Sequence, residues 1–286
     1  YDAEGNRLTR THLVSGATTR YAWDSRNRLT RVSEHADANP ETAAARIITY
    51  RYDSWDHLTR RAVDSNADGT DDVIAKYIYD GDQLAFETSG TNSLTHTYLW
   101  NLAADELVSD DRRNYEVRWS LADHEGTIRD LLHTNGSTLN HRRFDSFGKL
   151  TSESAPALDH LFAYAGRYYD ELTGLTLHGH RWYDPSVGRF ASEDPSGFTG
   201  GQDPNLYRYV GNNPVLLVDP SGLCSSSPSL WGVANTPTSS WGLPPRSGVS
   251  IPGFARYPSL PSASAQTKPA ASSDLRAIEA AAGARA

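Results

Sequence analysis

The stretches "YAWDSRNRL" (residues 21–29) and "YRYDSWDHL" (residues 50–58) share one pattern, and this pattern decides the fold. Each has an aromatic residue, any residue, a second aromatic, an Asp, and a Leu five positions after the Asp. Because side chains alternate across a β-strand, both rings of a copy lie on one face. The Asp opens a turn by accepting bonds from nearby backbone N–H groups, and a second strand begins near the Leu. Each copy therefore predicts a β-hairpin of roughly 20 residues.

The pattern recurs along the first half of the chain. A third copy is "YIYDGDQL" (77–84), where the Leu comes one residue early. Weaker copies are "YLWNLAADEL" (98–107) and "RRFDSFGKL" (142–150), with a worn copy around Asp123 and the end of another in the opening "YDAEGNRL". The Asp or Asn of successive copies lie 21–29 residues apart, a period typical of stacked structural units. A single hairpin is not stable alone, so the units must pair edge to edge. The sequence predicts an all-β fold built on one long sheet.

The composition fits this fold and argues against several classes of protein. The 15 Tyr and 7 Trp suit half-buried strands, and the single cysteine, Cys224, excludes an intramolecular disulfide framework. A net charge of −8 argues against a nucleic-acid partner, and no apolar stretch approaches the roughly 20 residues of a membrane span. Methionine is absent and Tyr1 lies inside a copy of the repeat. We therefore expect a fragment of a longer protein whose N-terminal region is missing.

A longer ordered match lies in residues 144–223. It comprises "FDSFGKL", "FAYAGRYYDELTGLTLHGHRWYDPSVGRFASEDPSGFTGG" and "NLYRYVGNNPVLLVDPSGL". This stretch resembles the Rhs repeat-associated core domain. The repeats before it resemble the YD repeats of bacterial Rhs proteins, of the C components of Tc toxins and of teneurins.

The resemblance implies a domain organisation and a location. Residues 1–143 would be YD-repeat β-hairpins that form part of a spiralling β-sheet shell. Residues 144–223 would be the core domain that plugs one end of the shell, and residues 224–286 a variable tail. The resemblance also implies a protein that is secreted or exposed at the cell surface.

The tetrapeptide DPSG occurs twice, at Asp194 and at Asp219. In one reading, each copy is a type I turn that ends a strand, with Pro at the second position and Gly at the fourth. In the other reading, two carboxylates are brought together, so that one activates water while the other donates a proton. Both readings are open from the residues alone.

The family resemblance favours the chemical reading. It implies catalytic roles for Asp194, Asp219 and the Arg181 of "RWYDP", with Arg181 keeping one carboxylate ionised, and it places the cut between Leu223 and Cys224. The chain would then be an intramolecular aspartyl-type autoprotease within a polymorphic-toxin-like shell, with its own C-terminal polypeptide as cargo. The alternative is a non-cleaving adhesive or structural protein of the cell surface.

One departure from the family pattern bears on this choice. The stretch "FTGGQDPNLY" carries extra residues, from Gln202 to Pro204, between the two DPSG turns. They lengthen the loop that connects the aspartates and could disturb their approach.

The stretch "DSNADGTDDV" (residues 64–73) resembles a calcium loop. Asp64, Asn66, Asp68 and Asp72 stand at positions 1, 3, 5 and 9 of such a loop, while position 12 is Ala75 in place of the bidentate Glu. The alternative is a solvated acidic loop between two hairpins. Calcium is the one cofactor that the sequence suggests.

Two further features concern His178, His180 and the end of the chain. His178 and His180 alternate on one strand face, but no third metal ligand is recognisable nearby, so we expect a structural role. Residues 224–286 are rich in Ser, Pro and Ala, and we expect them to be disordered because they can bury little apolar surface. They carry five basic and two acidic residues, which leaves −11 of the net charge for residues 1–223.

Overall fold

The computed structural model describes residues 1–39, 41–101, 106–112, 116–197, 204–223 and 225. The predicted tail, apart from Ser225, lies outside these residues. The described part contains strands and short 3-10 helices, so the predicted all-β class is confirmed. Among the described helices, none has the length and apolar character to cross a membrane.

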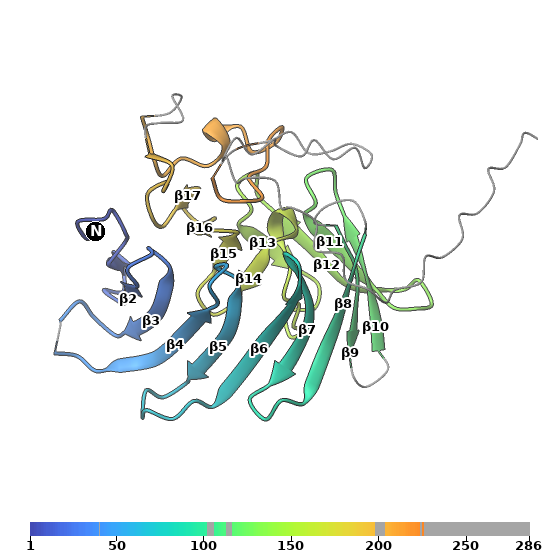
Figure 1. Ribbon diagram of the computed structural model, residues 1–286, viewed down its shortest axis with the longest axis horizontal. Coiled ribbons are helices and arrows are strands. Elements are labelled where there is room, and N and C mark those ends of the chain that lie inside the picture. The colour runs from blue at the N-terminus through green and yellow to red at the C-terminus, as the bar shows by residue number, and fades with distance from the viewer. Residues whose placement is uncertain (40, 102–105, 113–115, 198–203, 224, 226–286) are drawn as a thin grey trace, which may run out of the picture. The chain divides into compact units, whose positions relative to one another are not determined.

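The larger sheet has 13 antiparallel strands whose spatial order is their order in the sequence. Every strand therefore pairs with its neighbours in the chain, as edge-to-edge hairpins require, and in Figure 1 the labels β2 to β10 follow one another in an arc. The strands are β1 (Thr9–Thr11), β2 (Thr18–Trp23), β3 (Leu29–His35), β4 (Ala44–Tyr52), β5 (Leu58–Asp64), β6 (Val73–Asp80), β7 (Gln83–Ser89), β8 (Leu94–Trp100), β9 (Leu107–Arg112), β10 (Glu116–Ala122), β11 (Ile128–Leu132), β12 (Thr138–Phe144) and β13 (Leu150–Glu153).

A second, four-stranded antiparallel sheet follows in the chain. Its strands are β14 (Tyr168–Asp170), β15 (Leu175–His178), β16 (Arg181–Asp184) and β17 (Arg189–Phe190), and the 3-10 helices η1 (Tyr164–Gly166) and η3 (Val210–Asn212) flank it. The predicted domain boundary at residue 143 falls inside β12. The division into two domains stays a prediction.

The repeat aromatics join the two sheets in one hydrophobic cluster. Tyr50 packs against Trp182 of the small sheet with ring centroids 4.9 Å apart, and Tyr77 packs against Tyr168 at 5.7 Å. The first aromatic and the Leu of the repeats are buried in this cluster: Tyr21, Leu29, Tyr50, Leu58, Tyr77, Leu84, Tyr98 and Leu107. The small sheet thus covers the face of the large sheet that the aromatic pattern makes apolar.

The repeat Asp closes each turn with its own side chain. Asp24 Oδ1 accepts the backbone N–H groups of Arg26 at 2.9 Å and Arg28 at 3.0 Å. Asn27, between them, has a φ of 58°, in the left-handed region that Asn and Gly tolerate best. The Asp residues that accept the same two bonds are Asp2, Asp53, Asp123 and Asp145.

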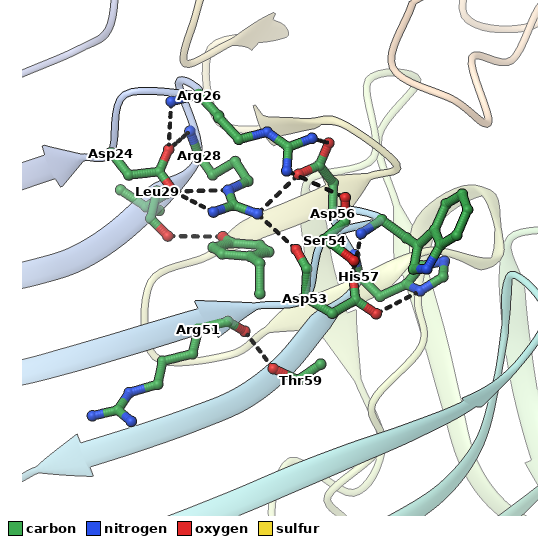
Figure 2. A network of polar contacts seen from close by, with 12 residues as sticks. Asp24, Arg26, Arg28, Leu29, Arg51, Asp53, Ser54, Asp56, His57 and Thr59 are labelled. Atoms are coloured by element: carbon green, nitrogen blue, oxygen red, sulfur yellow. Dashed lines mark hydrogen bonds and ion pairs between the residues drawn. The ribbon is translucent and has the colours of Figure 1, made fainter.

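Neighbouring turns are also tied to one another, as Figure 2 shows. Arg28 donates to its own Asp24 at 2.7 Å and to Asp56 of the next turn at 2.9 Å. His57, at the equivalent place one repeat later, contacts Asp53 of its own turn at 3.1 Å and Asp82 of the following turn at 3.3 Å. These contacts link successive turns along one rim of the sheet.

Candidate functional site

Arg181 lies at the centre of the candidate site. It begins β16 directly after the turn from β15, and only 3% of its surface is exposed. Its Nη2 atom lies 2.9 Å from Oδ2 of Asp194 and 3.5 Å from Oδ2 of Asp219. The structure therefore brings both predicted aspartates into contact with the guanidinium group of Arg181.

The rest of the guanidinium group is held from three sides. Nε donates to the carbonyl oxygen of Gly222, and Nη1 donates to that of Leu206 at 3.0 Å. The Cζ atom lies 3.6 Å from the ring centroid of Phe190, in cation–π geometry. Burial lowers the pKa of Arg181, while the two aspartates act in the opposite direction. A guanidinium group remains charged at neutral pH, so the site holds a fixed cation.

The two carboxylates have different surroundings. Asp194 Oδ1 accepts the N–H of Ser196 at 2.9 Å and its hydroxyl at 2.5 Å, in a turn with an exposed serine. Asp219 is buried, and its Oδ1 accepts the N–H of Leu223 at 3.1 Å. The first DPSG segment is a turn closed by the N–H of Gly197, which donates to the carbonyl oxygen of Asp194 at 2.9 Å. The second segment is a bend in which the side chain of Asp219 accepts the backbone N–H. Both segments converge on the same guanidinium group.

Two glycines allow the second DPSG segment to lie directly on the β15–β16 turn. A Cβ atom on Gly222 would lie 2.2 Å from the carbonyl oxygen of His178, and one on Gly179 would lie 2.4 Å from that of Ser221. Both glycines also have positive φ angles. Gly179 was not predicted as part of the site, although its position in the sequence just before Arg181 was a visible signal.

His178 contacts the backbone of the acidic turn. It is fully buried among aromatic rings, and its Nδ1 donates to the carbonyl oxygen of Asp219 at 2.8 Å. Burial lowers the pKa of His178 to about 3, so the ring is neutral at physiological pH. His180 is exposed, and its backbone N–H donates to the carbonyl oxygen of Ser221 at 3.0 Å. Among the described residues, no group of three or more potential metal ligands was found.

The family model described as "Teneurin YD-shell" matches residues 1–215 of the chain. The chain belongs to the teneurin YD-shell family.

Relatives of this YD-shell chain carry names of toxins and nucleases. It is 32% identical over 229 residues to the tRNA3(Ser)-specific nuclease WapA of Bacillus spizizenii, covering 78% of this chain and 9% of WapA. It is 30% identical over 246 residues to "Probable deoxyribonuclease RhsA" of Dickeya dadantii, covering 82% of this chain and 16% of RhsA. The chain therefore spans a small part of these relatives.

A solved structure shows the same fold. The crystal structure of TcdB2-TccC3 superposes on this YD-shell chain with a TM-score of 0.57 and 24% sequence identity. The superposed region covers 75% of the YD-shell chain and 11% of the TcdB2-TccC3 chain. This likeness supports the fold that the repeat pattern predicts.

The lengthened loop of this YD-shell chain leaves both aspartates in contact with Arg181. Gln202 lies outside the described residues and Pro204 lies within them. Leu206, just beyond the loop, supplies one of the carbonyl groups that hold Arg181. At the predicted cleavage site, Leu223 is half-buried and Cys224 lies outside the described residues.

The predicted calcium loop closes on its own backbone. Asp64 accepts the N–H groups of Asp68 at 3.1 Å and Gly69 at 2.8 Å, and Asp72 accepts that of Ser65 at 2.7 Å. These contacts describe the acidic loop that was the alternative to a calcium site. Calcium binding by Asp64, Asn66, Asp68 and Asp72 stays a prediction.

Proposed function

We propose that this chain is part of a toxin-like YD shell that cuts itself between Leu223 and Cys224 and carries its C-terminal polypeptide as cargo. The observation that carries the proposal is the position of Asp194 and Asp219 on the same Nη2 atom of Arg181. We assign these two carboxyl groups, which share one cation, as the proton acceptor and the proton donor of the reaction. The names of WapA and RhsA are consistent with a shell that delivers different cargoes. As the resemblance implies, we place the full-length protein outside the cell or at its surface.

The proposed reaction is hydrolysis of one peptide bond. A water molecule attacks the carbonyl carbon of Leu223 and gives a proton to one carboxylate of the pair. The other carboxyl group donates a proton to the nitrogen of Cys224, and the C–N bond breaks. The products are a carboxylate at Leu223 and a new amino terminus at Cys224. The bond from the N–H of Leu223 to Asp219 supports this assignment, since it ties the residue that bears the attacked carbonyl to the pair.

Substitution of Asp219 tests the proposal. The purified chain should run as two bands on a denaturing gel, and N-terminal sequencing of the smaller band should begin at Cys224. Asp219→Asn should give one uncut band because the amide keeps the size of the side chain but does not accept a proton. Asp145→Asn is the matched control, because Asp145 closes a similar turn far from Arg181 in the sequence. This variant chain should be cut as completely as the wild-type chain. A cut in Asp219→Asn would overturn the mechanism, and an uncut wild-type chain would favour the adhesive or structural alternative.

A further inference from the structure

The turn of the opening repeat copy, which we call the opening turn (residues 2–6), lies against the chain that follows β17. The backbone N–H of Arg7, the residue after this turn, donates to the carbonyl oxygen of Ala191 at 2.9 Å. The hydroxyl group of Tyr207 donates to the carbonyl oxygen of Gly5 at 2.8 Å. Both contacts join backbone groups at the start of the chain to residues far along it, so the opening turn is docked there.

A buried ion pair strengthens this docking. Nη1 of Arg7 lies 2.6 Å from Oδ2 of Asp184, and both side chains are buried. Asp184 is the last residue of β16, the strand that begins with Arg181. A buried charge is costly unless it is paired, so this strand is tied to the docked position of the opening turn.

Tyr207 connects the opening turn to the candidate site through its neighbour. The carbonyl oxygen of Leu206 accepts the N–H of Asp194 at 3.1 Å and Nη1 of Arg181 at 3.0 Å. One carbonyl group therefore holds both partners of the 2.9 Å ion pair between Arg181 and Asp194. Since Tyr207 is the next residue, a side chain fixed on the opening turn also limits the movement of this carbonyl group.

Glu193, which directly precedes Asp194, contacts the same hydroxyl group. Its Oε1 atom lies 3.1 Å from the hydroxyl oxygen of Tyr207, and its side chain lies over Gly5, where a Cβ atom would come 2.4 Å from Cδ of Glu193. Burial and the contact with Glu193 raise the pKa of Tyr207 to about 12. The hydroxyl group therefore keeps its proton at neutral pH and is a hydrogen-bond donor there.

We propose that Tyr207 is a positioning residue for the proposed self-cleavage, and that the opening turn holds it in place. The inference rests on the proposed function and adds a condition to it: Arg181 and Asp194 are set for reaction only when the opening turn is docked. Tyr207 acts through the carbonyl group of Leu206 and not on the peptide bond itself. The cut then follows the folding of the repeats and does not precede it.

Removal of one hydroxyl group tests the role of Tyr207. Tyr207→Phe should slow self-cleavage about tenfold, because a small misplacement of reacting groups is costly. Tyr183→Phe is the matched control, since the hydroxyl group of Tyr183 also donates to a backbone carbonyl, that of Phe147, at 2.8 Å. A time course of band intensities after cell-free synthesis measures the rates, and the control should match wild type. A wild-type rate in Tyr207→Phe, or an equally slow control, would overturn this role.

The pH dependence of the rate separates positioning from a loss of stability. Tyr207→Phe should shift the pH–rate profile in the same direction as Arg181→Ala, because both changes loosen the contact between a carboxylate and its cation. A rate lowered by the same factor at every pH would contradict the positioning role.

The part of the opening turn is tested at Arg7. Arg7→Gln breaks the buried ion pair and should also slow self-cleavage. Arg28→Gln is the matched control, because Arg28 also directly precedes the Leu of its repeat copy and pairs with Asp24 and Asp56. This control should be cut at the wild-type rate. A wild-type rate in Arg7→Gln would overturn the opening turn as the anchor of Tyr207.

Hydrogen exchange makes the test independent of the cut. All chains carry Asp219→Asn, so that they stay whole, and mass spectrometry follows the amide of Asp194, which donates to Leu206. Exchange should be several-fold faster in the two test variants than in their two controls. Equal exchange would overturn the link through Leu206 alone, whereas an uncut wild-type chain would overturn the proposed function.

Discussion

At the scale of single residues, Arg181 determines how the candidate site is arranged. Its Nη2 atom contacts both aspartates, and its Nε and Nη1 atoms contact two backbone carbonyl groups. A planar fork of donors can hold all these partners at once, whereas a lysine offers one compact ammonium group. The geometry of the site thus depends on arginine and not on positive charge alone.

Substitutions at Arg181 should separate geometry from charge. Arg181→Lys should slow self-cleavage, and Arg181→Ala should slow it further and alter its pH dependence, since both carboxylates lose their shared cation. A time course of band intensities on gels at several pH values measures both effects. Arg189→Ala, which changes an exposed arginine of β17, is the control and should cut at the wild-type rate. Wild-type kinetics in Arg181→Ala would remove Arg181 from the site.

His178 gives a prediction about stability. In the folded protein burial lowers its pKa to about 3, whereas an unperturbed histidine has a pKa of about 6.5. Below pH 6.5 the unfolded chain therefore binds a proton that the folded chain does not, and stability falls as pH falls from about 6.5 towards 3. Between pH 7 and pH 5 this one group should cost about 2 kcal/mol of unfolding free energy.

Urea unfolding at the two pH values measures this cost. His178→Gln should show a smaller loss between pH 7 and pH 5 than wild type, because the titrating group is gone. His133→Gln, at a histidine that is not buried, is the matched control and should lose as much as wild type. An equal loss in His178→Gln would mean that the ring is not held neutral.

At the scale of elements, the hairpins were predictable and their turns explain why. Asp accepts two backbone N–H groups in one turn, and the residue three positions later takes a left-handed conformation, so a short local sequence determines the whole hairpin. In "YIYDGDQL" the Leu comes one residue early because the turn is shorter: Asp80 pairs directly with Gln83 across a two-residue turn at Gly81. Local rules of this kind can be recognised in a sequence.

The candidate site was less predictable. Asp194, Asp219 and Arg181 were identified from the family resemblance, and their common contact comes from loops and strands distant in sequence. The approach of Gly222 to the carbonyl group of His178 is a contact between two backbones, which no periodic pattern encodes.

The turn contacts predict a defined cost for losing the repeat Asp. Asp53→Ala removes the acceptor of two backbone N–H groups and should lower the free energy of unfolding by about 1–2 kcal/mol, as does the loss of a helix cap. Asp53→Asn keeps an acceptor oxygen in the same place and should cost less. Urea unfolding at neutral pH compares the two. An equal loss in both variants would show that the charge of Asp53, and not its acceptor oxygen, stabilises the turn.

At the scale of the whole molecule, the described part depends on the contact between its two sheets. The repeat tyrosines of the large sheet are buried by aromatic residues of the small sheet, such as Trp182 and Tyr168. The large sheet therefore presents an apolar face that it cannot cover by itself.

Truncation tests this dependence. A chain that ends at residue 153 keeps all 13 strands of the large sheet but lacks the small sheet, and it should aggregate or bind a hydrophobic dye. A chain that ends at residue 225 keeps both sheets and should elute as a single species on size exclusion. A soluble truncated chain that binds no dye would show that the large sheet is stable without its cover.

The order of strands in the large sheet also has a consequence for biosynthesis. Because spatial order equals sequence order, each new hairpin can add to the sheet as soon as the ribosome has released it. The strands that cover the apolar face are made last, so a nascent chain carries an exposed row of tyrosines until synthesis of this region is nearly complete. During that interval the cell must prevent unfinished chains from associating, and slow translation between β13 and β17 would prolong the risk.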